Sequence, residues 1–396
     1  MNLDRGIASR TISEGATLQL TLVHDWLNQV GGAEDVLVDL VSLYPDSPIY
    51  TSLYAPELMP DAYRAWDIRP LWLDRMPAIH QRHQPYLPLY PLAWNSLFLG
   101  GDVILSNKSG FCHGLRFDAK RTIHVCYCLT PTRYVWLLDD YIAREGLSRP
   151  AQLALRPMVR LLKRWDYEAA QRVTHFVAIS TEIQTRIKTY YNRDSVIIFP
   201  PVDTTRFVPV AADEVDDYFL IVSRLIPYKR IDLAVQAATR LGLPLKIGGR
   251  GRDLERLRSM AGPTVEFLGY VPDSELPNLM ARARAFIFPG LEDFGITPVQ
   301  AQAAGRPVIA YAGGGALDTV IPGVTGETFE TLSVDSLAAV MANFDASRYA
   351  PVAIRQHALR FDTRLFAQQI TTYVEAAWEA HQRNEPLMWR NPIQLS

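Results

Sequence analysis

The chain has 396 residues, of which 48% are hydrophobic and 21% are charged, and its net charge is −2. This length suffices for two domains of ordinary size, and the composition is that of a globular protein. The small net charge gives no reason to expect a polyanionic partner, so we do not expect nucleic-acid binding.

The cysteine content and the absence of apolar runs indicate a compartment. The three cysteines, Cys112, Cys126 and Cys128, form no disulfide framework, which favours a reducing environment. We find no secretory signal and no run of about 18 apolar residues. We therefore expect a cytoplasmic protein, with residues 1–16 loosely held. Cys126 and Cys128 alternate along an apparent strand, so packing is a better interpretation for them than metal binding.

The first strand is expected at residues 18–23, and a glycine loop follows it. Gly31 and Gly32 close this loop, and a helix pattern begins there with apolar residues on one face. The spacing is not the G-x-G-x-x-G of dinucleotide-binding proteins. A simple tight turn therefore explains these glycines as well as a ligand-binding loop does.

Residues 66–99 combine tryptophans and tyrosines with several prolines, which argue against one long helix. One interpretation is a large packed loop with short helices. The other is an aromatic, basic cover for a lipid-borne acceptor, or a contact with a membrane interface.

Two more strands, at residues 103–106 and 123–128, each lead into a polar loop. The carboxyl ends of parallel strands are where open α/β sheets bind ligands. His113 in the first loop and Arg133 in the second are thus candidates near an acceptor. A lone histidine in a loop is more often structural.

Residues 151–172 form a long helix pattern with a basic character, which suits anionic lipid or a solvated face. A strand at 173–180, a helix from Thr181 and a strand at 196–199 follow. The segment Pro200-Pro201-Val202-Asp203 then breaks the pattern, and we place a domain boundary just after it.

In the second half, Arg224 and Lys229 flank Pro227 between a strand at 218–223 and a helix from Ile231. Two cations placed at a strand end and a helix start can hold a diphosphate. Strands at 245–248 and 265–268 continue the alternation, with Asp273 expected to cap the next helix. Regular alternation of strands and helices predicts a doubly wound parallel sheet.

Residues 288–315 carry the most informative pattern. A buried strand at 285–288 ends in Pro289-Gly290, and Glu292 lies in the loop beyond. We expect Thr297 to cap a short helix that Gly305 closes, followed by a strand at 308–311. A helix N-terminus behind Gly295 favours a phosphate-like anion, and Glu292 is placed to hold sugar hydroxyls. A nucleotide-sugar would fill both parts of the site.

This stretch resembles the E-x7-E region of retaining nucleotide-sugar glycosyltransferases of family GT4, which have the GT-B fold. The resemblance implies that Glu292 binds the donor hexose and that the segment from Phe294 through Gly295 and Ile296 to Thr297 offers N–H groups to sugar and phosphate. Gln300 stands where the family has a second glutamate for the ribose. By the same resemblance, Gly31 and Gly32 face the diphosphate, and the loops of Gly249 and Val271 hold the base.

We therefore expect two Rossmann-like domains, an acceptor domain at 1–205 and a donor domain at 206–374, with a tail at 375–396 crossing back onto the first. No D-x-D occurs, so we expect no metal and no cofactor. Arg224, Lys229 and the helix N-terminus would stabilise the leaving diphosphate, with Glu292 and His113 completing the catalytic set. The resemblance implies front-face transfer, in which the departing phosphate assists the acceptor.

The segments CYC-LTPTRY and FPPVD look most like those of bacterial mannosyltransferases of polysaccharide and O-antigen assembly. GDP-mannose is thus the expected donor, and a glycan or lipid-linked saccharide the acceptor, with peripheral membrane contact. Relatives often have histidine where this chain has Leu129. The alternatives are a UDP-hexose donor, a non-catalytic nucleotide-sugar-binding protein of the same fold, and, on weaker grounds, a GT-B epimerase or phosphorylase.

Overall fold

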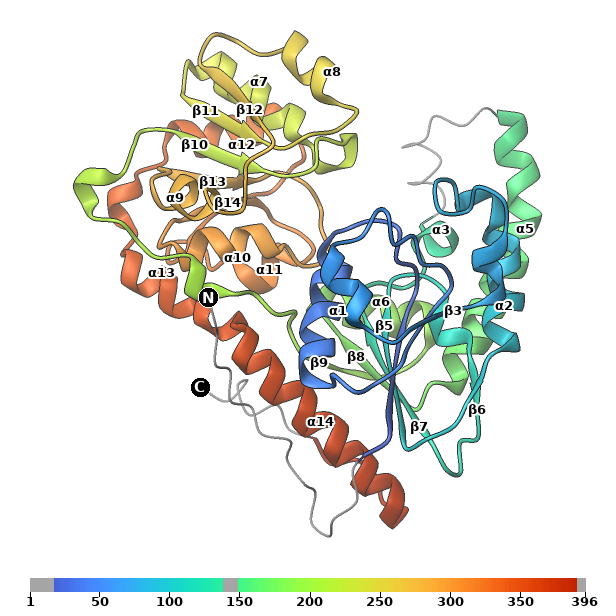
Figure 1. Cartoon of the computed structure of the whole chain (residues 1–396). Coiled ribbons are helices and arrows are strands. Elements are labelled where there is room, and N and C mark those ends of the chain that lie inside the picture. Colours follow the sequence, from blue (N-terminus) through green and yellow to red (C-terminus); the bar gives the residue numbers. More distant parts are fainter. Residues whose placement is uncertain (1–17, 138–148, 390–396) are drawn as a thin grey trace.

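The computed structural model describes residues 18–137 and 149–389, and for residues 149–154 it describes only the backbone. Two parallel sheets dominate the molecule, one in each half of the chain (Figure 1). Helices cover both sheets, and the long helix α14, Thr363–Arg383, runs from the C-terminal half along the N-terminal half. The expected α/β class with two doubly wound sheets is what the structure shows.

The N-terminal sheet has seven parallel strands in the order β3-β2-β1-β5-β7-β8-β9. The order reverses at β1, between β2 and β5, as in other doubly wound sheets. Every residue of β1, β5 and β7 is buried, which is the pattern of strands covered on both faces. The strands are β1 Leu20–His24, β2 Ile49–Thr51, β3 Ile68–Pro70, β5 Val103–Lys108, β7 Ile123–Cys128, β8 His175–Ala178 and β9 Ser195–Ile197. The α-helices around them are α1 Gly32–Leu43, α2 Tyr90–Ser96, α3 Arg133–Trp136, α5 Arg149–Arg172 and α6 Thr181–Tyr191.

The aromatic segment 66–99 folds as short helical turns rather than as one long helix. It contains two 3-10 helices, Trp72–Arg75 and Gln84–Leu89, before α2. Its strand β4, Phe98–Leu99, pairs with β6, Arg116–Phe117, outside the main sheet. Trp94 and Tyr90 are fully buried in a core of their own. The expected packed loop with short helices is thus present, and this packing does not bear on what the exposed side chains of the segment contact.

The C-terminal sheet has six parallel strands in the order β12-β11-β10-β13-β14-β15, with the reversal between β10 and β13. The strands are β10 Phe219–Val222, β11 Leu245–Gly248, β12 Val265–Gly269, β13 Ala285–Phe288, β14 Val308–Tyr311 and β15 Gly326–Phe329. The α-helices are α7 Ile231–Leu241, α8 Leu254–Ser259, α9 Leu276–Ala281, α10 Ile296–Ala303, α11 Ala316–Thr319, α12 Val334–Ala342 and α13 Pro351–Ala358.

Two expected helix caps are wrong. Helix α10 begins at Ile296, so its cap is Gly295 rather than Thr297. Gly295 has a φ of 101°, a conformation open to glycine, and this lets the chain turn into the helix earlier than a threonine cap would. Helix α9 begins at Leu276 with Glu275 as its cap. A turn precedes it, in which the Pro272 carbonyl accepts from the N–H of Glu275, so Asp273 lies before the helix.

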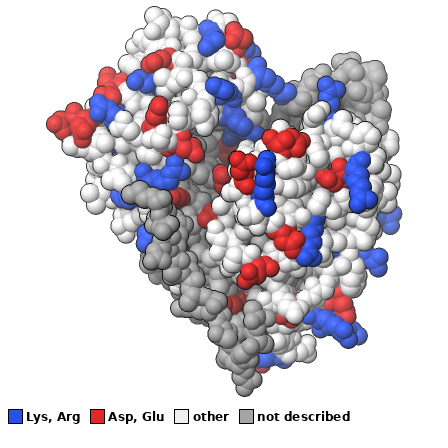
Figure 2. Space-filling model, viewed as in Figure 1, with Lys and Arg blue, Asp and Glu red and all other residues white. Residues whose placement is uncertain are grey.

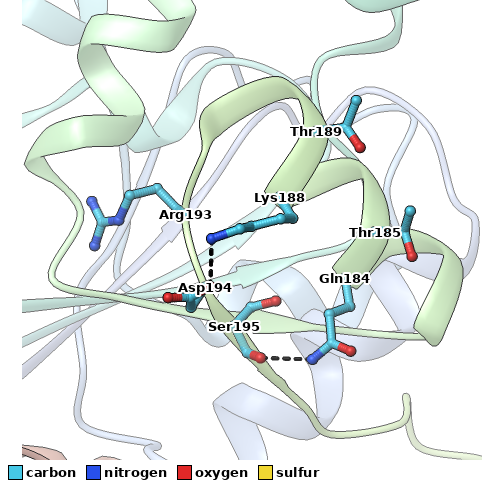
Figure 3. A pocket seen from close by; sticks show the side chains of 7 residues that line it. All are labelled: Gln184, Thr185, Lys188, Thr189, Arg193, Asp194 and Ser195. Atoms are coloured by element: carbon cyan, nitrogen blue, oxygen red, sulfur yellow. Dashed lines mark hydrogen bonds and ion pairs between the residues drawn. The ribbon is translucent and has the colours of Figure 1, made fainter.

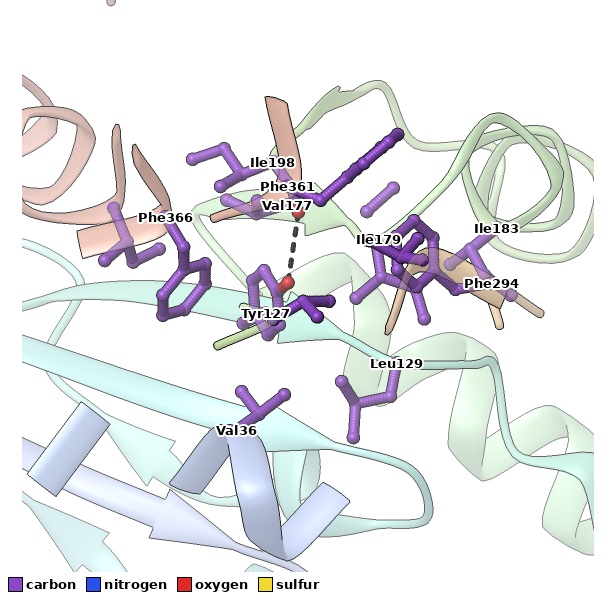
Figure 4. Close-up of a cluster of buried hydrophobic side chains, with 14 of the residues drawn as sticks. Val36, Tyr127, Leu129, Val177, Ile179, Ile183, Ile198, Phe294, Phe361 and Phe366 are labelled. Carbon is purple, nitrogen blue, oxygen red and sulfur yellow. Dashed lines mark hydrogen bonds between the residues drawn. The ribbon is translucent and has the colours of Figure 1, made fainter. Parts of the chain in front are cut away.

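The two halves share one continuous core. Val202 bridges to Asp362 where the chain first leaves the N-terminal half and where α14 later returns to it. Phe366 of α14 packs on Tyr127 of β7 at 5.5 Å between ring centroids, and the Tyr127 hydroxyl donates to the Ile198 carbonyl at 3.0 Å (Figure 4). The expected returning tail is thus a helix that begins at Thr363, while residues 390–396 lie outside the described residues.

Candidate donor site between the two sheets

The candidate site lies where the strand order of the C-terminal sheet reverses. A hollow there is lined by the carboxyl ends of β10 and β13 together with Lys229, Glu292 and Thr297. In doubly wound sheets this switch point is where ligands bind. In Figure 2, Lys and Arg side chains gather on the upper part of the C-terminal lobe, on the side toward the N-terminal lobe.

Lys229 and Glu292 meet at this hollow. The Lys229 ammonium contacts a carboxylate oxygen of Glu292, and the two side chains are 18% and 12% exposed. Their loops pack backbone to backbone, since a Cβ on Gly290 would lie 2.9 Å from the Lys229 carbonyl oxygen. Two residues that the sequence placed in separate motifs are thus one ion pair. Arg224 is exposed on the loop that follows β10.

Gly314 and Gly315, here called the glycine floor, pack against the backbone of the Glu292 loop. The N–H of Gly315 donates to the Glu292 carbonyl at 2.9 Å. A Cβ on Gly314 would overlap the carbonyl oxygen of Glu292, and one on Gly315 would overlap the backbone of Phe294. No role for Gly314 or Gly315 was expected from the sequence. Three consecutive glycines one residue after a strand were the signal that could have shown it.

Helix α10 presents its N-terminus to the same hollow. Its first-turn N–H groups have no partners within the helix, which favours an anion there. Gly295 packs tightly, because a Cβ on it would lie 2.8 Å from the Phe288 ring. Gln300 is half-buried one turn further along the helix.

The Gly31-Gly32 loop lies against α10 from the N-terminal side. A Cβ on Gly32 would lie 3.3 Å from Cδ1 of Ile296. Gly31 caps α1, so the N-termini of α1 and α10 come close at this point. The structure therefore places the glycine pair beside the candidate phosphate site.

The loops expected to hold the base are adjacent to the Arg224 loop. Gly249 has a φ of 132°, its N–H donates to the Gly269 carbonyl at 2.6 Å, and a Cβ on it would overlap the Ser223 carbonyl. A Cβ on Gly248 would lie 2.7 Å from Cγ2 of Val271. The three strand ends of β10, β11 and β12 thus form one continuous surface.

The structure does not support His113 as a catalytic residue. His113 is fully buried, and its Nε2 lies 3.2 Å from the Asp166 carbonyl. Burial, together with the nearby Lys108 ammonium, lowers the pKa of the imidazole well below its usual value. A group that takes part in transfer must reach the substrate, so we remove His113 from the catalytic set.

The buried carboxylate of Asp25 holds the loop that carries His113 in place. Its two oxygens accept from the four successive backbone N–H groups of residues 109–112, at 2.6 to 2.7 Å. Arg133, the other acceptor-side candidate, forms an ion pair with Asp293 instead. Neither Asp25 nor Asp293 was singled out from the sequence.

A separate polar hollow of about 360 Å³ lies on the N-terminal half between α6 and β9 (Figure 3). Lys188 and Asp194 pair across it at 2.9 Å, and Gln184 donates to the Ser195 carbonyl at 2.7 Å. Four of its seven lining residues are thus paired with one another, and the hollow shares no residue with the site between the sheets.

Residues 203–358 match the family model described as glycosyl transferases group 1. A GDP-mannose-dependent alpha-(1-6)-phosphatidylinositol monomannoside mannosyltransferase of Mycobacterium tuberculosis is 34% identical over 39% of this chain and 48% of that protein. The matched segment contains Arg224, Lys229 and Glu292, and it makes up less than half of the chain.

Another relative is also named as a glycosyltransferase. A D-inositol 3-phosphate glycosyltransferase of Geodermatophilus obscurus is 28% identical over 58% of this chain and 60% of that protein. The chain thus spans about half the length of the mannosyltransferases it matches.

Solved structures show the fold. Anabaena HepE in complex with UDP superimposes with a TM-score of 0.65 at 18% identity, covering 90% of this chain and 100% of that one. Sucrose-phosphate synthase of Thermosynechococcus elongatus gives a TM-score of 0.68 at 17% identity, covering 91% and 100%. The expected GT-B fold class is confirmed.

Proposed function

We propose that this chain is a retaining glycosyltransferase that transfers a hexose from a nucleotide-sugar to a glycan or lipid-linked acceptor. The observation that carries the proposal is the meeting of Lys229 and Glu292 beside the N-terminus of α10. A cation, a carboxylate and free N–H groups at one switch point match the charged diphosphate and the hydroxyls of such a donor.

Each group has a distinct part in the proposed reaction. The diphosphate would draw the Lys229 ammonium and the exposed Arg224 guanidinium toward its oxygens, and the α10 N–H groups would share its charge. Glu292, released from Lys229, would then accept from hexose hydroxyls. Donors already in place as the diphosphate leaves stabilise the developing charge without reorganisation.

We propose mannose, carried by GDP, as the hexose. The support is that several matched relatives are named as GDP-mannose-dependent mannosyltransferases. A UDP-hexose is the second candidate, and the structural neighbour that was solved with UDP favours it. Both donors contain a diphosphate, so the proposed diphosphate clamp, which consists of Arg224 and Lys229, does not choose between them.

The acceptor side is proposed to face a membrane. Several exposed apolar side chains lie on α2, α5 and their neighbouring segments: Trp72 at 42%, Leu92 at 61%, Phe98 at 61% and Leu161 at 73% exposed. Arg160 and Arg164 of α5 are exposed nearby along the same helix. Apolar side chains among arginines favour an anionic lipid surface. Among the described helices, none has the length and apolar character needed to cross a membrane.

A panel of nucleotide-sugars tests the donor. We expect GDP-mannose to bind and to undergo slow hydrolysis, with other GDP- and UDP-hexoses as comparisons. Preferred turnover of a UDP-hexose would reject the mannose proposal and keep the transferase. Tight donor binding with no turnover in the presence of saccharide-lipid acceptors would favour a binding protein.

Sedimentation with vesicles containing anionic lipid, compared with neutral vesicles, tests the membrane contact.

A further inference from the structure

Glu292 and Asp293 are neighbours in sequence, but their side chains bind opposite halves of the molecule. Glu292 pairs with Lys229 of its own half. Asp293 pairs with Arg133 and, at 2.9 Å, with Arg186, both of which belong to the N-terminal half. The candidate sugar-binding carboxylate is therefore one residue away from an ion cluster that joins the two halves.

This cluster is shielded from solvent at its centre and balanced in charge. Asp293 is 13% exposed and Arg186 is 12% exposed. Arg186 also donates to Glu182 at 2.7 Å, so two arginines face two carboxylates. Burial by itself would raise the pKa of Asp293, but Arg133 and Arg186 hold it below its usual value. Removing one partner from such a shielded cluster leaves an uncompensated charge, which costs more than breaking a solvent-exposed ion pair.

Further contacts join the N-terminal half to this loop and to the helix that follows it. The Phe294 ring is 3% exposed and stacks on Phe199 with 5.9 Å between centroids. Figure 4 shows Phe294 beside Ile179 and Ile183 of the N-terminal half. Asp318, on the helix that follows the glycine floor, accepts from the N–H of Thr181 at 2.9 Å.

We propose that Asp293 is a positioning residue through which Arg133 and Arg186 of the N-terminal half set the placement of Glu292 for sugar transfer. The inference rests on the proposed function, because it assigns Glu292 to the hexose. It follows that a change in the relative position of the two halves moves Glu292 directly. Arg133 begins α3, directly after the loop that follows β7 and on the expected acceptor side, so occupation of that side and placement of Glu292 are coupled.

The test compares Asp293→Asn with Asp335→Asn. Asp335 forms a comparable carboxylate–arginine contact, with Arg240 at 2.6 Å, but its side chain is 88% exposed and remote from the site. We expect Asp293→Asn to lower kcat for hexose transfer about tenfold or more while the Kd for the nucleoside diphosphate stays within about threefold. Asp335→Asn should change neither. Asp293→Glu, which keeps the charge, should recover part of kcat.

Two outcomes would overturn the inference: an unchanged kcat in Asp293→Asn, or equal losses in kcat and nucleotide affinity, which would indicate collapse of the whole loop. Arg186→Gln provides a second variant if Asp293→Asn does not fold. Combined with Asp293→Asn, it should add little to the loss in kcat, since both changes break the same contact. Additive losses would contradict the coupling.

Amide hydrogen exchange separates this inference from the proposed function. In Asp293→Asn we expect faster exchange at residues 291–296 and unchanged exchange in β11. Unchanged exchange at 291–296 would overturn the positioning role whatever the activity. Faster exchange there, with no sugar transfer by the parent from any donor, would support the role in holding the loop and would reject the transferase instead.

Discussion

The Lys229 ammonium contacts the Glu292 carboxylate, although the two residues lie on loops that follow different strands of the C-terminal sheet. Each side chain is the other's counter-ion, so a change at either one affects both. A donor that binds at this point must exchange this contact for its own. Affinity and catalysis at this site are therefore linked through one ion pair.

The diphosphate clamp is tested by Arg224→Ala and Lys229→Ala. A lost charge-assisted contact is worth roughly 1.5–3 kcal/mol, so each change should raise the donor Kd about tenfold or more. The two variants should differ in stability, because Lys229→Ala leaves Glu292 without its cation and Arg224 is exposed. Titration calorimetry with GDP and thermal unfolding measure both effects. If both variants bind nucleoside diphosphate like the parent, the clamp lies elsewhere.

Glu292 and Gln300 are expected to act on different parts of the donor. Glu292→Gln keeps the size and removes the charge, so turnover should fall far more than donor affinity. Gln300→Glu restores the residue of the resembling family, and it should tighten donor binding or leave it unchanged without abolishing transfer. Steady-state kinetics and nucleotide titrations on both variants decide this. Unchanged turnover in Glu292→Gln would remove the central assignment.

Chelation should leave activity intact. The proposed reaction assigns the leaving diphosphate to Arg224, Lys229 and the α10 N-terminus rather than to a metal ion. We therefore expect equal initial rates with and without EDTA. Loss of activity in EDTA that magnesium or manganese restores would show that this account of the leaving group is wrong.

The strands were predicted well, because the run of apolar residues that indicates a buried strand lies within the strand itself. The strands at 123–128, 285–288 and 308–311 begin and end where they were expected. The start of α10 was missed because a positive-φ glycine replaced the usual side-chain cap. Such a conformation depends on the packing around Gly295 rather than on its neighbours in sequence.

The parts of the site that the sequence did not reveal are long-range contacts. Asp293 is 160 positions from Arg133 and 107 from Arg186, so no local spacing indicates their ion pairs. The burial of His113 likewise results from α5, which packs over its loop and carries Asp166. Residue type suggested a catalytic histidine, and only the tertiary structure shows that it is enclosed.

Acidification should destabilise the protein in part through His83. This side chain is 6% exposed, lies 4.9 Å from the Trp26 ring between centroids, and has its pKa lowered by burial to about 4. Between the usual pKa of about 6.5 and this value, the unfolded chain binds the proton and the folded one does not. The free energy of unfolding therefore falls as the pH falls through this window, by up to about 1.4 kcal/mol per unit.

The matching variant is His83→Gln, which cannot take up a proton. Urea unfolding of both proteins at pH 7 and pH 5 measures the difference. We expect the parent to lose stability relative to the variant at pH 5. Curves that shift in parallel would show that His83 stays neutral in both states or charges in both.

The glycine floor should be intolerant of a single methyl group. In Gly315→Ala the new Cβ would overlap the backbone of Phe294, and backbone cannot move aside as a flexible side chain can. Overpacking of this kind costs typically about 1–3 kcal/mol, and here the displaced segment carries Glu292. We expect a lower unfolding temperature together with a lower kcat. Gly100→Ala is the control, because a Cβ there meets nothing within 4 Å. If Gly315→Ala matches Gly100→Ala in both measurements, the floor does not hold the Glu292 loop in place.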